Sequence, residues 1–187
     1  MTNQTLVIDL DRIVSVDVET SGSHPSEYAL LSIGACTLFQ PRDIFYAELT
    51  PDREQEDPKA MAVHNLTMEH LRDAGRPPAQ ALREFSRWLE QALPEGSRPL
   101  FMGFNAPFDW MFINDYFLRY TGANPFGHSA LDIKSFLMGF RRISWDQTSM
   151  RNLTDDPLLH NALADAEAQA DIFLDILKSG SVLLDNE

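Results

Sequence analysis

Four acidic residues and one histidine occur in three short stretches whose composition suits the binding of divalent metal ions. The stretches are Asp17-Val18-Glu19-Thr20, Phe104-Asn105-Ala106-Pro107-Phe108-Asp109 and His160-Asn161-Ala162-Leu163-Ala164-Asp165. Hard ions such as Mg²⁺ and Mn²⁺ prefer oxygen ligands, and two such ions about 3.5–4 Å apart can assist the in-line hydrolysis of a phosphodiester. The three stretches are therefore candidates for one site with this chemistry.

The first stretch continues a run that is typical of a β-strand. Ile13-Val14-Ser15-Val16 is rich in β-branched residues, and side chains on a strand alternate between its two faces. Asp17 and Glu19 should therefore project from the same face at the strand end. A pair of acids in this pattern is also common at solvated strand ends, so it becomes informative only together with the other stretches.

Asp109 is predicted to lie where a strand gives way to a helix. The apolar segment Pro99 to Phe104 is typical of a strand, and Phe108 to Phe117 of a helix. Asn105 is predicted to cap this helix, because Asn is a favoured N-cap residue. Asp109 would then lie in the first turn, where a carboxylate can also simply stabilise the helix dipole.

Asp165 is predicted to lie in the first turn of the last long helix, whose alanines would let it pack close to a sheet. Positions five apart on an α-helix differ by about 140° in direction. His160 and Asp165 can therefore meet only if His160 lies on the loop that precedes the helix, after Asp155-Asp156-Pro157. Taken alone, His160 would be an ordinary loop histidine.

The order and spacing of the three stretches are more specific than any one of them. On these motifs the chain resembles the DEDDh 3′-to-5′ exonucleases, from about Ile13 to Leu177. The resemblance implies an α/β ribonuclease H-like fold, a mixed sheet flanked by helices, as a single domain over residues 1–187. It implies two Mg²⁺ or Mn²⁺ ions as cofactors and His160 as the general base, since imidazole accepts a proton near neutral pH. The metal-binding carboxylates that it implies are Asp17, Glu19, Asp109 and Asp165.

A further segment, His64-Asn65-Leu66-Thr67, is similar to the His-Gly-Ile-Thr-like segment that lines the substrate path in this family. Asn replaces the usual Gly, and Asn tolerates the left-handed backbone better than most residues. Thr67 could also simply cap a short helix from Met68. The expected substrate is the 3′ end of single-stranded nucleic acid, DNA or RNA. The predicted substrate-binding residues are Thr20, His64, Phe104, Asn105 and Phe108.

The net charge of −13 argues against a phosphate-binding protein, although the proposed metal site itself contributes part of the acidity. Residues 119–154 nevertheless carry a local charge of +3 and include Trp145. This stretch is either a surface that guides the nucleic-acid strand or a mixed solvated loop. Its charged residues are Arg119, Lys134, Arg141, Arg142 and Arg151 against Asp132 and Asp146.

The remaining elements are predicted from hydrophobic patterns. Strands are expected at Tyr28 to Leu38 and Asp43 to Leu49, a helix at Ala79 to Leu93, and a loop at Gly122 to Gly127. With 187 residues and 44% hydrophobic content, the chain can form one well-packed domain. The only cysteine, Cys36, is expected to be buried and inert. Core positions of the helix are predicted to be Leu82, Phe85, Leu89 and Leu93.

Neither a signal peptide nor a run of about 18 apolar residues is recognisable, so a cytoplasmic protein without a membrane segment is expected. The resemblance allows a homodimer or a polymerase partner without choosing between them. Two other functions remain open. One is an aspartyl-nucleophile phosphatase, whose D-x-D-x-T motif differs at Glu19; the other is a catalytically silent module that binds nucleic acid or a polymerase.

Overall fold

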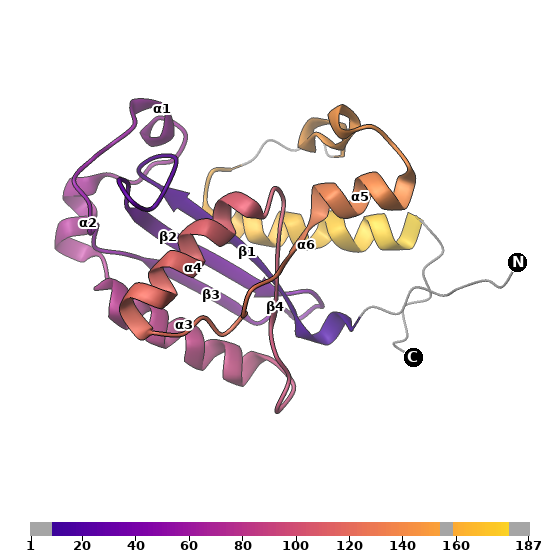
Figure 1. Ribbon diagram of the computed structural model, residues 1–187, viewed down its shortest axis with the longest axis horizontal. Helices are drawn as coiled ribbons and strands as arrows, with labels where there is room; N and C mark the ends of the chain where they lie inside the picture. Colours follow the sequence, from indigo (N-terminus) through magenta and orange to yellow (C-terminus); the bar gives the residue numbers. More distant parts are fainter. Residues whose placement is uncertain (1–8, 154–158, 180–187) are drawn as a thin grey trace, which may run out of the picture.

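A five-stranded mixed sheet forms the centre of the computed structural model, which describes residues 9–153 and 159–179 (Figure 1). The strand order is β3-β2-β1-β4-β5. β1 pairs antiparallel with β2 and parallel with β4. The predicted mixed sheet flanked by helices is confirmed. The strands are β1 (Ile13–Thr20), β2 (Leu30–Thr37), β3 (Ile44–Glu48), β4 (Leu100–Gly103) and β5 (Ala130–Asp132).

Helices cover both faces of the sheet (Figure 1). One face packs against α3 and α4 through a core that includes Val14, Phe85 and Phe112. The other face packs against α5 and α6 through a core that includes Ile13 and Phe173. The helices are α1 (Pro58–Met61), α2 (Met68–Ala74), α3 (Pro78–Ala92), α4 (Pro107–Thr121), α5 (Ile133–Arg141) and α6 (Ala162–Ser179), with 3₁₀ turns η1 (Leu10–Arg12), η2 (Trp145–Thr148) and η3 (Met150–Asn152).

The alternation of β1 decides which face carries its acids. Val14, Val16 and Val18 belong to the core under α3 and α4. Successive side chains on a strand point to opposite faces. Asp17 and Glu19 are therefore directed toward α6, side by side as predicted.

α6 lies unusually close to the sheet. Ala162, Ala166 and Ala170 are fully buried along one stripe of the helix. Gly34 of β2 is the register partner of Asp17, and a Cβ at position 34 would overlap the backbone of Ala162 and Leu163. Small residues on both elements thus let the start of α6 reach the strand that carries Asp17.

The helix expected at Ala79 to Leu93 is confirmed to within one residue at each end, and its four core positions are buried. Cys36 is buried as expected, and burial raises the pKa of its thiol to about 12. β5 was not predicted, because a strand of three residues has too short a pattern to recognise. The helix α5 was not predicted either. No helix in residues 9–153 or 159–179 has the length and apolar character needed to cross a bilayer.

Candidate active site

Asp109 is held where β1 and β4 separate. β4 pairs with β1 only along Ile13–Ser15, which leaves the backbone N–H of Val18 without a strand partner on that side. Val18 donates this hydrogen to Oδ1 of Asp109 at 3.1 Å. Asp109 lies in the first turn of α4, as predicted, and is only 5% exposed. The end of one strand and the start of a helix therefore fix this carboxylate beside Asp17 and Glu19.

The prediction that Asn105 caps α4 with its side chain is wrong. Asn105 has a left-handed backbone (φ 67°), and its backbone carbonyl accepts the Phe108 N–H at 3.1 Å. Ala106 is the N-cap residue, and its N–H donates instead to Oδ1 of Asp132 at 3.1 Å. Asn tolerates the left-handed conformation that this tight turn needs. The side chain of Asn105 is left exposed.

The start of α6 has the arrangement that the His160–Asp165 spacing predicts. His160 is exposed on the preceding loop in a left-handed conformation (φ 49°). Asn161 caps the helix, since its Oδ1 accepts the Ala164 N–H at 3.1 Å. Asp165 follows in the first turn and accepts the Leu159 N–H at 3.2 Å. The residues Asp155-Asp156-Pro157, assigned to the same loop, lie outside the described residues.

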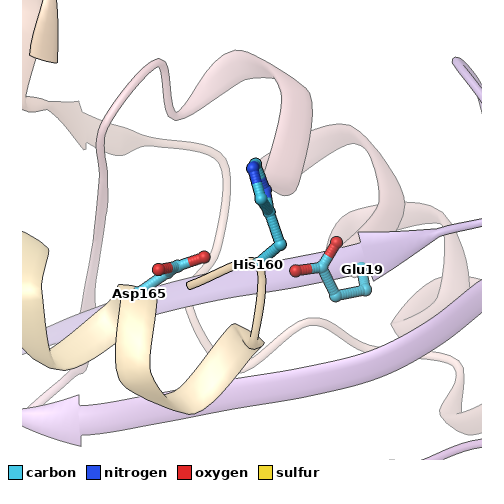
Figure 2. Close-up of side chains that lie close together, drawn as sticks. All are labelled: Glu19, His160 and Asp165. Carbon is cyan, nitrogen blue, oxygen red and sulfur yellow. The ribbon is translucent and has the colours of Figure 1, made fainter. Parts of the chain in front are cut away.

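Glu19, His160 and Asp165 converge at the end of β1 (Figure 2). One potential ligand atom from each residue lies within 4.8 Å of those of the other two. Figure 2 shows Glu19 on the strand and Asp165 on the helix, with His160 on the loop that leads into α6. Asp17 and Asp165 line the same cleft, of about 460 Å³. The structure therefore brings all five predicted catalytic residues to one end of the sheet.

The four carboxyl groups all have raised pKa values, chiefly because they are buried. Burial raises the pKa of Glu19 to about 7, with a further contribution from the charge of Asp165. Burial raises the pKa of Asp109 to about 8. Burial and then the charge of Asp109 raise the pKa of Asp17 well above its usual range, and burial also raises that of Asp165. A divalent cation would reverse these shifts, so the donor set fits hard metal ions.

Gln169 is a site residue that the motifs did not reveal. Its Nε2 donates to Oδ1 of Asp17 at 2.6 Å, and its Oε1 accepts the Phe104 N–H at 2.9 Å. The side chain is 2% exposed and lies one turn after Asp165 on α6. The only available signal was a polar residue on the buried alanine face of the helix. Gln169 thus fixes Asp17 by a direct hydrogen bond from α6.

His64 docks against the end of β1. Its Nδ1 accepts the Leu66 N–H at 3.3 Å, so Nε2 carries the proton that is donated to the Thr20 carbonyl at 3.3 Å. Burial lowers the pKa of His64, which favours this neutral form. Thr67 caps α2, as expected. Asn65 does not have a positive φ, so the backbone here does not need glycine.

The predicted aromatic and basic residues separate into two groups. Phe104 lines the cleft with Asp17 and Asp165, whereas Phe108 packs its ring 5.5 Å from that of Phe112 in the core. Among the basic residues of 119–154, Lys134 lines the cleft. Arg119 instead forms ion pairs with Asp52 and Asp115. The alternative that residues 119–154 are a mixed solvated loop is wrong, because they include β5, α5, η2 and η3; their role in guiding a strand stays a prediction. The sequence could not show that Arg119 pairs with Asp52, which is distant from it in the chain.

Comparisons with known proteins agree with this geometry. The family model RNase_T, described as an exonuclease, matches residues 14–173. The 3′-5′ DNA exonuclease Cap18 of Escherichia coli is 44% identical over 170 residues, which cover 88% of this chain and 91% of that protein. These matches favour a nuclease over the aspartyl-nucleophile phosphatase.

Two solved structures share the fold. The nuclease domain of 3′hExo, a DEDDh family member bound to rAMP, has a TM-score of 0.76 and 17% identity over 96% of this chain and 98% of that one. S. pombe Pop2p in a Mg²⁺- and Mn²⁺-bound form has a TM-score of 0.67 and 13% identity, and the match covers 94% of this chain and 86% of Pop2p. The family match and the similarity to Cap18 show that the chain belongs to the RNase_T exonuclease family and is a 3′-to-5′ exonuclease.

Proposed function

We propose that this exonuclease removes mononucleotides from the 3′ end of single-stranded DNA with two divalent ions, Mg²⁺ or Mn²⁺. The proposed ligands are Asp17, Glu19, Asp109 and Asp165, with His160 as the general base. The observation that carries the proposal is the convergence of these side chains at the end of β1. Similarity to a DNA exonuclease supports DNA as the substrate, and the ions of Pop2p support the cofactor.

The residues of the site have distinct tasks in this proposal. Two bound ions supply Lewis-acid stabilisation of the attacking and leaving oxygens. His160 is exposed beside Glu19 and Asp165, where it can accept a proton from the attacking water. As the water oxygen bonds to phosphorus, the bond to the 3′-oxygen of the preceding nucleotide breaks, and that oxygen takes up a proton from solvent. The products are a nucleoside 5′-monophosphate and a strand one nucleotide shorter.

The residues around the four acids favour a substrate whose 3′ end is unpaired. The cleft has Phe104 beside Asp17 and Asp165, and stacking of a base on an aromatic ring contributes about 1–3 kcal/mol. We place the terminal nucleotide near Thr20 and His64, with Asn105 and Phe108 at the start of α4 as further candidate contacts. We therefore expect an unpaired 3′ end to reach Phe104 and the acids more readily than a paired one.

The test is digestion of a 5′-labelled single-stranded DNA, the matching RNA, the blunt duplex and a 3′-blocked strand, each in Mn²⁺ and in excess chelator. We expect a ladder of shortened single-stranded DNA that requires both metal and a free 3′ end. Asp17→Asn should abolish it, whereas Asp73→Asn, which changes an exposed acid of α2, should not.

Each other outcome has a definite meaning. Activity in chelator or on the blocked strand would overturn the proposed mechanism. Faster digestion of RNA, or of the blunt duplex, would overturn the proposed substrate alone. Binding of DNA without any product in Mn²⁺ would instead indicate the catalytically silent module.

A further inference from the structure

Lys134 and Trp145 form a cationic and aromatic wall of the cleft that contains the acids. Lys134 lies in the first turn of α5 and Trp145 opens η2. Nζ of Lys134 lies 4.1 Å from the centroid of the Trp145 ring. Both residues line the cleft with Asp17, Phe104 and Asp165. A ligand that reaches the acids from this side must therefore pass the ammonium group and the indole.

The indole is exposed although its backbone is firmly held. Trp145 is 47% exposed, whereas Trp88 and Trp110 pack against the core. Ser144 and Gln147 form a capping box around η2. The fully buried Thr148 donates its hydroxyl hydrogen to the Trp145 carbonyl at 2.7 Å. The Lys134 ammonium group lies over one face of the indole, and the remaining exposed surface of the ring is held in place for a ligand.

We propose that Lys134 and Trp145 form a subsite for the nucleotide immediately 5′ of the scissile phosphate, with its base on the indole and its own phosphate at the ammonium group. This inference rests on the proposed function. Every base has a flat face that can stack on an aromatic ring, so the subsite would accept any sequence. Asp146 lines the same cleft and repels phosphate, which confines the phosphate to the Lys134 side.

The position of the subsite along the strand follows from the arrangement of the elements. In Figure 1 the α1–α2 region and the α5–η2 region lie on opposite sides of the end of β1. His64 contacts the Thr20 carbonyl on the first side, and Trp145 and Lys134 lie on the second. A strand that crosses the acids with its terminal nucleotide near His64 would therefore carry the preceding nucleotide past Trp145.

The test couples a protein change to a substrate change. An eight-nucleotide thymidine strand is compared with strands that carry one abasic nucleotide at the terminal, penultimate or third position. For the wild type, loss of the penultimate base should lower kcat/KM about 5- to 150-fold, the equivalent of 1–3 kcal/mol for one stack. Trp145→Ala should lower kcat/KM on the complete strand by a similar factor. Removing the penultimate base from the substrate should then lower the kcat/KM of this variant only a little further. Trp145→Phe should retain most of the wild-type kcat/KM.

A purely structural role would give a different pattern. If Trp145 only holds η2 against α5, the mutation and the loss of a base lower kcat/KM independently, so that the two factors multiply at every position of the strand. That result would overturn the proposal. Coupling to the terminal base alone would overturn the assigned position. A wild type that degrades none of the strands would instead contradict the proposed function.

Lys134 has a separate measurement. A single phosphate contact contributes about 0.7 to the slope of log affinity against log salt for single strands. Lys134→Ala should make the salt dependence of KM shallower by about this amount, whereas Lys178→Ala, an exposed lysine near the end of α6, should not change it. An unchanged slope would remove Lys134 from the subsite.

Discussion

At the scale of single residues, the site combines groups that perform chemistry with groups that hold them in place. In the proposed mechanism His160 belongs to the first kind, because it is exposed and lies near both Glu19 and Asp165. Gln169 belongs to the second kind, because it links Asp17 to the backbone of Phe104 while buried beneath the cleft. The two kinds of residue should respond differently to mutation.

His160→Ala should lower kcat by about 10²–10⁴, the usual contribution of a general base, with little change in the metal requirement. His160→Asn should lower kcat by the same factor, although Asn tolerates the left-handed backbone at this position. Steady-state kinetics of both variants check this, with the exposed His128→Ala as the control. An unchanged kcat in both variants would exclude His160 from the mechanism.

Gln169→Leu should raise the Mn²⁺ concentration for half-maximal activity about 10–100-fold, as is typical when the partner of a metal ligand is lost. It also leaves the Phe104 N–H without its acceptor, which costs about 1–3 kcal/mol of stability. Gln169→Glu retains that acceptor but removes the hydrogen-bond donor to Asp17.

Metal titrations and thermal melts of both Gln169 variants separate the two roles, with the exposed Gln91→Leu on α3 as the control. Lower stability of Gln169→Leu without any greater need for Mn²⁺ in either variant would show that Gln169 is only structural.

At the scale of elements, most of the site could be predicted because its geometry depends on local periodicity. The alternation of β1 places Asp17 and Glu19 on one face, and the spacing of His160 and Asp165 requires a loop before the helix. What could not be predicted depends on contacts distant in sequence. The Ala106 N–H donates a hydrogen bond to Asp132, and the Gln169 side chain donates one to the Asp17 carboxylate. No local sequence pattern specifies either partner.

Gly34→Ala should lower kcat/KM about 10²-fold, because the added methyl group displaces the start of α6 and misplaces the groups it carries. Overpacking of this kind also costs about 1–3 kcal/mol of stability. Gly139→Ala is the matched control, since a Cβ on this exposed position of α5 meets nothing within 4 Å. That variant should retain full activity and melt no lower than the wild type.

In activity assays and thermal melts, Gly34→Ala should therefore fall below the wild type on both measures, whereas Gly139→Ala should not. Equal activity of Gly34→Ala and the wild type would mean that α6 can withdraw without disturbing the site.

At the scale of the whole molecule, the net charge of −13 and the clustered acids mean that cations bound at the proposed site would also stabilise the fold. The carboxyl pKa values of the site are raised in the fold, so the metal-free native state binds more protons than the unfolded chain between about pH 4, where free carboxyls titrate, and pH 8. The stability of the chelated protein should therefore rise as the pH falls from 8 to 5.

Asp109→Asn should melt higher than the wild type in chelator at pH 8 and depend less on pH, because it removes an acid whose pKa is raised to about 8. Asn can still accept the Val18 N–H. A hundredfold excess of Mn²⁺ over its Kd should stabilise the wild type by about 2.7 kcal/mol and the variant by less.

Thermal melts over this pH range, with and without Mn²⁺, check these expectations, with Asp73→Asn as the control. A variant that melts lower in chelator and gains as much from Mn²⁺ as the wild type would show that Asp109 is a structural hydrogen-bond acceptor.

The dependence of the site on α6 also has a consequence for the synthesis of the protein. Asp17 and Glu19 are translated early, whereas His160, Asp165 and Gln169 belong to the last segment of the described fold. A nascent chain whose α6 is still inside the ribosomal exit tunnel has only part of the acid cluster. In the proposed mechanism such a nascent chain cannot degrade nucleic acid until α6 docks against Gly34.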